Sequence, residues 1–523
     1  MKQLRLTYYL PLLLLLISGC ATVPKDVQRP VSYALTETET EHTVLGDLVF
    51  PEEEKHLGLS GFMLLDQGKL ALDSRLALVA LAEKSIDIQT YLWKQDTAGR
   101  LLAEGLLDAA DRGVRIRVLL DDYTLRDRDF GLAAFDAHPN VSIRIFNPFG
   151  TRFYLGPINL RRKFELITDL SRLNYRMHNK VFVVDNQTGI VGGRNIADEY
   201  YGYNEKYNFF DLDLLASGPV INDVSYGFDN YWNSEWAYPI TAFRKHPPED
   251  KIPELYNGLR TLVEERRREL GLQRLQSKDQ LKILQQMVAK FIWARAEVAI
   301  DNPDKADGKE TNLTGGVAEH LRDTARESQS EILIVSPYFI PASNFSNYLS
   351  DKHKRGVTVE VLTNSMASTN QIAAFSGYAR YRKDVIGSGT KLFEFKSDVA
   401  QFVIEEDIPG SSGNSGLHAK VMIFDRKRVF VGSFNLDPRS INLNTEIGLL
   451  VYSEELATQV AELIDELIKP ENSWQVTLDD DGDLVWQGSE NGLAVMHKGD
   501  PEAGGWRKFK TFIFSMLPIE EHL

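Results

Sequence analysis

Two segments of this chain carry the same polar residues at the same spacing, and any fold must place both copies usefully. The first copy contains His178, Lys180, Asp185, Gly192 and Asn195, and the second contains His418, Lys420, Asp425, Gly432 and Asn435. A single His-x-Lys pair is an ordinary feature of a polar strand face. Two copies of one extended pattern instead indicate an internal duplication whose copies act together.

In each copy an apolar run follows the lysine, at residues 181–184 and 421–424. The runs are short, rich in β-branched and aromatic residues and bounded by polar residues, which predicts buried strands. Side chains two positions apart on a strand point to the same face, so the His and the Lys of each copy share a face. A polar turn and an apolar return strand follow, which should bring the Asn of each copy beside its own His.

A His, a Lys and an Asn on one face suit phosphoryl transfer. The Lys offers a point charge for a phosphate oxygen, and the imidazole can be a nucleophile or a general acid. Hydrogen-bond donors come from Asn195, Asn435 and Ser433. Asp185 and Asp425 lie an odd number of positions from their His, so we expect them on the other face or at the turn, as scaffold groups.

The pattern His-x-Lys-x4-Asp-x6-Gly-[Gly/Ser]-x-Asn, present twice, resembles the signature of the phospholipase D superfamily. Other stretches resemble one branch of it, the cardiolipin synthase C-like bacterial lipoproteins; they are residues 146–149, 172–180, 432–440, 444–446 and 517–520. The resemblance runs from about residue 60 to the end. It implies an α/β fold of two pseudo-twofold-related, phospholipase D-like sandwich halves, with mixed sheets flanked by helices and one shared active site.

The resemblance also implies residue roles. The implied catalytic set is His178, Lys180, Asp185, His418, Lys420 and Asp425. By resemblance His178 forms a covalent phosphohistidine, and His418 protonates the departing alcohol and then deprotonates the acceptor, although the duplication leaves the two roles nearly interchangeable. The lysines, the asparagines and Ser433 would hold the phosphoryl oxygens. Their charges and dipoles would do what a metal does elsewhere, so we expect neither a metal nor a cofactor. Gly193 stands where the family usually has Ser, so the first copy has one hydrogen-bond donor fewer than the second.

Each imidazole needs a partner on its second ring nitrogen, which sets its tautomer and basicity. Glu446 lies at the start of the next apolar strand after the second motif, and Asp211 and Asp213 lie at the corresponding place after the first. Asp213 aligns with Glu446 when the starts of the downstream helices are matched. Asp213 and Glu446 therefore resemble the family's orienting carboxylates, and a polar strand edge is the alternative for Asp211 and Asp213.

An alternation of helices and strands recurs around the two motifs. Predicted helices are 73–82, 98–110, 318–328 and 343–354, and predicted strands are 85–92, 114–120, 331–336 and 357–362. This order implies α/β layers with a mixed or parallel sheet. The expected parts are a first half at 59–240, a helical connector at 241–315, a second half at 316–470 and a C-terminal hairpin and extension at 471–523.

Two segments outside the halves allow more than one interpretation. Residues 254–268 and 278–298 are predicted to be helices of the connector, with a membrane contact at residues 291–293 as the alternative. The acidic run 479–483 lies between strand-like flanks and is predicted to be a hairpin turn. A calcium loop is the alternative, but Leu484 stands where such a loop needs Gly.

Residues 1–20 are predicted to be a lipoprotein signal peptide. A basic start precedes an apolar run, residues 8–17, that is too short to span a bilayer. Ile17, Ser18, Gly19 and Cys20 then resemble a bacterial lipobox, in which Cys20, the sole cysteine, is lipidated. A plain signal peptide or a short anchor is the alternative. Residues 21–58 are predicted to be a flexible tether, and Ala21 favours sorting to the outer membrane over the inner one.

These features predict a lipid-anchored, cardiolipin synthase-like phosphatidyltransferase of the bacterial cell envelope that faces the periplasm. The expected substrates are phosphatidylglycerol and, as a second candidate, phosphatidylethanolamine. The net charge of −15 argues against broad nucleic-acid binding. The alternatives are a hydrolase that releases phosphatidic acid, a nuclease, and a non-catalytic lipid-binding lipoprotein. A monomer is expected, because the duplicated halves already supply both histidines.

Overall fold

The computed structural model describes residues 23–516 except 126, 151, 153–164, 166–167, 275, 308–315, 342–344 and 400–412. The predicted signal peptide with Cys20, and residues 517–520, lie outside the described residues.

Most of the described strands of both halves, 18 in all, belong to one mixed sheet. The first half contributes β1 (Ser60–Leu65), β2 (Ser85–Thr90), β3 (Arg115–Asp121), β4 (Val141–Phe146), β5 (Val181–Val184), β6 (Thr188–Gly192), β8 (Asp213–Ser217) and β9 (Ala237–Pro239). The second half contributes β10 (Ile292–Ile300), β11 (Glu331–Val335), β12 (Thr358–Asn364), β13 (Lys391–Phe395), β15 (Val421–Phe424), β16 (Arg428–Gly432), β17 (Ile447–Tyr452) and β18 (Ser473–Leu478). The sheet ends in β19 (Leu484–Glu490) and β20 (Leu493–His497).

The two halves have the same strand order. It is β9–β4–β3–β2–β5–β6–β8–β1 in the first half and β18–β13–β12–β11–β15–β16–β17–β10 in the second, and β1 pairs with β10 to join them. In each half, three neighbouring strands are parallel, β2–β3–β4 and β11–β12–β13, and the other pairs are antiparallel. This repeated mixed topology confirms the predicted α/β duplication.

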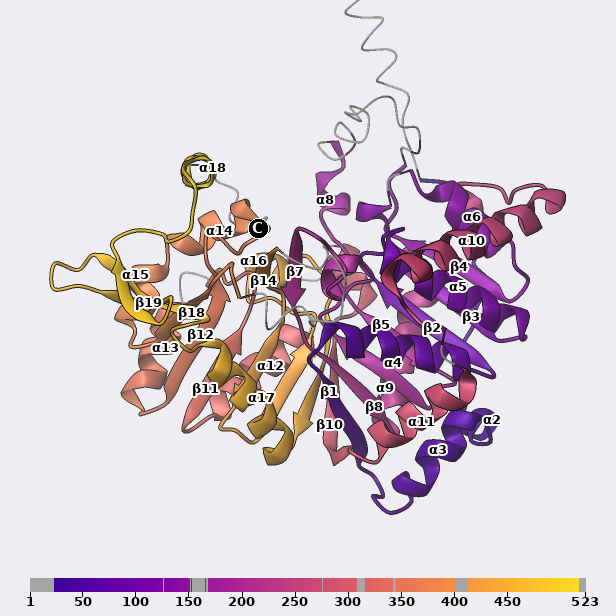
Figure 1. The fold of residues 1–523 in the computed structure, drawn as a ribbon, viewed down its shortest axis with the longest axis horizontal. Helices are drawn as coiled ribbons and strands as arrows, with labels where there is room; N and C mark the ends of the chain where they lie inside the picture. The colour runs from indigo at the N-terminus through magenta and orange to yellow at the C-terminus, as the bar shows by residue number, and fades with distance from the viewer. Residues whose placement is uncertain are drawn as a thin grey trace, which may run out of the picture.

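Helices cover the sheet in both halves, which lie side by side in Figure 1. The longer helices are α3 (Val44–Glu53), α4 (Gly68–Leu81), α5 (Thr97–Asp111), α6 (Asp129–Asp136), α9 (Pro219–Trp232), α10 (Ile252–Leu270), α11 (Ser277–Val288), α12 (Val317–Glu327), α13 (Phe345–Lys354), α14 (Ile372–Ala379), α17 (Glu454–Leu467) and α18 (Gly505–Ser515). The shorter ones are α2 (Glu37–Thr40), α8 (Leu170–Leu173), α15 (Arg382–Gly387) and α16 (Pro438–Asn442). A separate two-stranded sheet pairs β7 (Tyr207–Phe210) with β14 (Asn414–Leu417).

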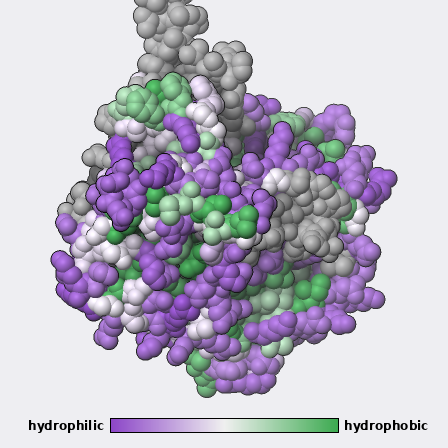
Figure 2. Space-filling view, turned by 60° about the vertical axis from the view of Figure 1, so that its left-hand side comes forward, coloured by the Kyte–Doolittle hydropathy of each residue, from purple (hydrophilic) through white to green (hydrophobic). Residues whose placement is uncertain are grey.

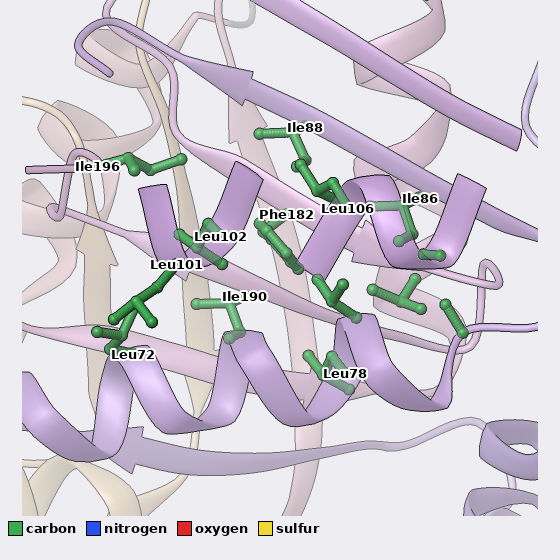
Figure 3. Close-up of a cluster of buried hydrophobic side chains, with 14 of the residues drawn as sticks. Leu72, Leu78, Ile86, Ile88, Leu101, Leu102, Leu106, Phe182, Ile190 and Ile196 are labelled. Atoms are coloured by element: carbon green, nitrogen blue, oxygen red, sulfur yellow. The ribbon is translucent and has the colours of Figure 1, made fainter. Parts of the chain in front are cut away.

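Three large cores hold these layers together, and the motif strands contribute to all of them. Figure 3 shows part of the first core, to which Leu78 of α4, Leu106 of α5 and Phe182 of β5 all contribute. The next residue along β5, Val183, points to the opposite face and joins a core that the two halves share, together with Ile423 of β15. Both motif strands are therefore buried on both faces, as their short apolar runs predict.

Two predictions about the segments around the first half are wrong. The region expected to be a flexible tether contains α3, in which Leu45 and Val49 are fully buried in the first core. The helix predicted for 278–298 ends at Val288, and β10 follows and fills the place in the second half that β1 fills in the first. β10 has apolar residues on both faces, a pattern that sequence periodicity does not separate from a helix.

The structure also bears on the two alternatives left open by the sequence, a membrane contact at residues 291–293 and a calcium loop at residues 479–483. Phe291 is buried in the first core and residues 292–293 pair with β1, so these residues do not lie on the amphipathic helix that the membrane alternative assumed. The acidic run is the turn of the β18–β19 hairpin, in which Asp479 accepts hydrogen bonds from the backbone of Asp481 and Asp483. Among the described residues, no helix is both long and apolar enough to cross a bilayer.

Candidate active site

The two motif histidines lie where the halves interlock. The backbone N–H of His178 donates to the carbonyl of Thr445 at 2.9 Å, and that of His418 donates to the carbonyl of Phe210 at 2.8 Å. Each histidine is thus held by the backbone of the opposite half, in the same way on both sides. Neither half can form this arrangement alone.

Each imidazole also contacts a carboxylate from the opposite half. His178 Nδ1 lies 2.9 Å from Glu446 Oε2, and His418 Nδ1 lies 2.6 Å from Asp211 Oδ2. Both carboxylates are fully buried. A ring that donates from Nδ1 to a carboxylate keeps Nε2 free for chemistry, so this pairing sets the same tautomer in both rings.

The choice of Asp213 as the orienting carboxylate of the first half is wrong. In the sheet register Gly192 faces Asp213 while Gly432 faces Gly448, so Asp213 corresponds to Gly448 and Asp211 corresponds to Glu446. Asp213 instead forms a buried ion pair with Arg75 at 2.9 Å and also contacts Arg194. Matching the starts of the downstream helices shifted the alignment of the two halves by two residues. Such a shift keeps a side chain on the same side of the sheet, but it pairs Glu446 with Asp213 instead of Asp211.

Gly193 and Ser433 differ because the two carboxylates differ. A Cβ on Gly193 would overlap the carboxylate of Asp211, so this position has no room for the expected serine. In the second half the Ser433 hydroxyl donates to Glu446 Oε2, and Ser440 donates to Oε1 at 2.8 Å. The structure therefore places Ser433 against the carboxylate that orients His178, rather than in the cavity where it was expected to bind phosphate.

The two motif lysines are buried beside the histidines. Lys180 Nζ donates to the carbonyl of His178, and Lys420 Nζ lies 2.9 Å from His418 Nδ1. Burial lowers the pKa of Lys180 to about 7 and that of Lys420 to about 8, although nearby carboxylates oppose the shift. These amines are close to a balance between their charged and neutral forms near neutral pH, so an anionic ligand would favour the charged form.

Burial also lowers the pKa of both histidines. It brings the pKa of His178 to about 4, against the opposing pull of Glu446, and that of His418 to about 3, with a further contribution from the charge of Lys420. Both rings are therefore neutral at neutral pH before substrate binds. A neutral imidazole has the lone pair that a nucleophile requires.

Both histidines line a single cavity of about 640 Å³. Asn195 and Asn435 line it too, and the side-chain oxygen of each is buried without a hydrogen-bond partner in the described structure. Tyr91 packs its ring edge-on against His178, and Tyr200 does the same against His418, with centroid separations of 5.2 and 5.0 Å. The paired motifs thus form one pseudo-symmetric site, as their duplication predicts.

The motif aspartates hold the scaffold and do not line the cavity. Asp185 accepts hydrogen bonds from the backbone N–H groups of residues 83–85, and Asp425 accepts them from those of residues 329–331. Both have positive φ, which the tight turn after each motif strand requires. The direct catalytic role that the motif implied for them does not fit this geometry. The scaffold role expected from strand parity does.

Asp437 and Tyr200 are among the cavity-lining residues that sequence reasoning missed. Asp437 lines the cavity and caps α16 through the backbone N–H of Ser440, and burial raises the pKa of Asp437 to about 7. The signal for Asp437 was its position two residues after Asn435, where the first copy has Ala197. Tyr200 had no comparable signal, because it comes from a short turn that only the tertiary structure brings to His418.

The family model for the cardiolipin synthase, phospholipase D-like domain matches this chain twice, at residues 76–232 and 321–468. Each match contains one complete copy of the motif. The chain belongs to the cardiolipin synthase-like family of the phospholipase D superfamily. This membership confirms the family and the enzyme class that the paired motifs predict.

Individual relatives support the same conclusion. Cardiolipin synthase C of Escherichia coli (strain K12) is 36% identical over 481 residues, which cover 91% of this chain and 99% of that protein. The major cardiolipin synthase of Bacillus subtilis (strain 168) is 25% identical over 411 residues, covering 77% and 68%. The crystal structure of phosphatidylserine synthase from Haemophilus influenzae Rd KW20 matches with a TM-score of 0.56 at 14% identity, covering 91% of this chain and 100% of that one. This last likeness concerns the fold alone.

Proposed function

We propose that this protein is a phosphatidyltransferase that makes cardiolipin through a phosphohistidine intermediate. The observation that carries the proposal is one cavity with two histidines, each oriented by a buried carboxylate of the opposite half. Two such imidazoles suit a double displacement at phosphorus, because one can attack while the other moves the proton.

In the first step Nε2 of His178 attacks the phosphorus of a phosphatidyl donor. The N–P bond forms, the bond to the headgroup oxygen breaks, and His418 gives that oxygen a proton. In the second step His418 takes the proton from an acceptor hydroxyl, the hydroxyl oxygen attacks phosphorus, and the N–P bond breaks. With phosphatidylglycerol as both donor and acceptor, the products are glycerol and cardiolipin. Phosphatidylethanolamine is a second candidate donor, with ethanolamine as its leaving group.

His418 must be protonated when the donor is bound, and two groups favour this. The phosphodiester brings a negative charge next to the ring, and Asp211 stabilises the charge on the opposite nitrogen. Asn195 and Asn435 line the cavity, and their amide groups would hold the non-bridging oxygens as charge develops. Lys180 and Lys420 are buried beside the histidines and would supply positive charge from there.

Lipid analysis of cells that express the wild type and His178→Ala tests the reaction. Cardiolipin made only by the wild type supports transfer, and phosphatidic acid alone would indicate hydrolysis. DNA cleavage without a change in lipids would indicate a nuclease. Asp185→Asn is a matched control, because it alters a motif residue outside the cavity.

The proposal includes a lipid anchor on Cys20 and an outer-membrane location facing the periplasm. The supporting observations are the lipobox-like sequence and Ala21. Mass spectrometry of the mature N-terminus, with Cys20→Ser as the comparison, tests the anchor. Fractionation of the envelope on a density gradient tests the location, and recovery of the protein in the inner-membrane fraction would contradict it.

A further inference from the structure

Helix α18, near the end of the described chain, has an apolar face that the described residues leave exposed. Its exposed side chains are Trp506, Phe509, Phe512 and Ile513, and Met516 follows them. At about 100° per residue these positions span an arc of about 120° on one side of the helix. Among the described residues, every other helix exposes at most one large apolar side chain.

The charges of α18 also differ from those of the rest of the protein. The chain has a net charge of −15, yet residues 504–516 contain Arg507, Lys508 and Lys510 and no acidic residue. Lys508 lies at one edge of the apolar arc and Lys510 lies at the other. An apolar arc that contains Trp and Phe between two lysines is typical of a helix that lies in the interface of an anionic bilayer.

α18 is fixed beside the mouth of the catalytic cavity. Arg507 donates hydrogen bonds to the carbonyls of Met366 and Thr369, at 2.7 and 2.8 Å. Thr369 is followed by α14, on which α18 packs, and residues 370, 371, 373 and 374 line the cavity. The helix is thus attached to one wall of the active site, and its apolar face points away from the protein.

The pictures place the helix on the same side of the molecule as the cavity. In Figure 1, α18 lies on the upper side with α8, α14 and α16, and α8 and α14 both contribute to the lining of the cavity. Figure 2 brings the left-hand side of Figure 1 forward, and apolar side chains gather near its top, at the height of α18 in Figure 1. Tyr123 and Leu170, two of the cavity-lining residues, are themselves exposed.

We propose that α18 inserts its apolar face into the interface of an anionic phospholipid bilayer and so holds the mouth of the catalytic cavity against the membrane. The inference rests on the proposed function for its purpose, since a diacyl substrate must reach His178 without leaving the bilayer completely. It does not depend on the N-terminal anchor. An anchor gives proximity to the membrane but leaves the orientation of the cavity free, whereas a second contact fixes it.

A fluorescence experiment tests the insertion without reference to catalysis. Phe512→Cys and, as the reference, Leu493→Cys on β20 are each labelled with an environment-sensitive dye in the full-length protein. Leu493 is 70% exposed and Phe512 is 60% exposed. The labelled proteins are mixed with vesicles of phosphatidylglycerol and phosphatidylcholine that carry bromine on their acyl chains. Unsubstituted protein gives the blank for any labelling at Cys20.

Strong quenching at position 512 and weak quenching at 493 support the proposal. Equal quenching at both positions, or none at 512, would overturn it. Protection of the dye at 512 from iodide before vesicles are added would also overturn it, because another part of the chain or a second copy would then cover the helix. The double variant Lys508→Glu, Lys510→Glu should bind the vesicles at least 25-fold more weakly, as measured by the vesicle concentration that gives half-maximal quenching. This figure takes about fivefold for each lysine. The loss should be smaller with phosphatidylcholine alone.

A matched pair of triple variants then connects insertion to the reaction. Trp506→Ser, Phe509→Ser and Phe512→Ser together should lower the transfer rate on vesicles at least tenfold and leave the rate in detergent mixed micelles within about twofold. The control variant carries Ser at three other exposed apolar positions (Tyr226→Ser, Leu493→Ser and Met496→Ser) and should change neither rate. Equal losses in vesicles and micelles would contradict the docking role. If dye insertion occurs but no lipid is transferred by the wild type, the proposed function fails and the docking surface stands.

Discussion

The paired carboxylates lead to a prediction that separates the roles of the two histidines. Asp211→Asn keeps the shape of the side chain and removes the charge that faces His418 Nδ1 at 2.6 Å. Burial alone would raise the pKa of Asp211, but the charges of His418 and Lys420 outweigh it and lower the pKa from its ordinary 3.8 to about 2. The same coupling favours the imidazolium form of His418 over the neutral ring.

The size of this coupling sets the expected loss of rate. The drop in the pKa of Asp211 corresponds to about 2–3 kcal/mol, or roughly 60-fold in rate, if the transition state loses all of it. The full contribution of a general acid, about 10⁴-fold, gives the upper limit. We expect the transfer rate of Asp211→Asn to fall between these limits. Glu446→Gln, which changes the partner of His178, is the matched variant.

Pre-steady-state kinetics with a p-nitrophenyl phosphodiester reveals which step each histidine serves. Nitrophenolate leaves without a proton, so forming the phosphohistidine from this substrate does not need an acid. Asp211→Asn should therefore keep a burst of about one equivalent of nitrophenolate and then turn over slowly, since His418 must still activate the acceptor. Glu446→Gln should lose the burst itself. The opposite pattern would exchange the two histidine roles, and an unchanged rate in both variants would refute the assignment of these carboxylates.

Three further predictions follow from the same geometry. The amines of Lys180 and Lys420, with pKa values of about 7 and 8, are charged mainly below those pH values, so kcat/KM should fall as pH rises through this range. Lys180→Arg keeps its charge at any of these pH values, so the part of the fall that comes from position 180 should move above pH 9. Gly193→Ala should lower activity at least 100-fold with little change in overall fold by circular dichroism, since its Cβ would displace Asp211, whereas wild-type activity would contradict the close approach. Asp425→Ala should destabilise the protein by about 2 kcal/mol in denaturant unfolding and keep kcat within about threefold, and a loss of kcat without a loss of stability would restore a catalytic role for this residue.

The outcomes for the aspartates show what strand parity can predict. An odd spacing from the His placed Asp185 and Asp425 away from the catalytic face, and the structure finds both at turns, bonded to the backbone. Parity could not choose between Asp211 and Asp213, because both point to the same side of the sheet. That choice depended on the register between β6 and β8, which is set by pairing between strands rather than by the sequence of either one.

The sequence by itself determined the duplication, the buried motif strands and the two histidines and two asparagines that meet at the cavity, because short-range spacing and periodicity are properties of a single segment. Tertiary structure decided that each histidine takes its carboxylate from the opposite half, through backbone contacts of His178 with Thr445 and of His418 with Phe210. It also turned the end of the expected connector into β10 and left one face of α18 uncovered. These features depend on contacts between segments hundreds of residues apart, and local sequence preference does not encode them.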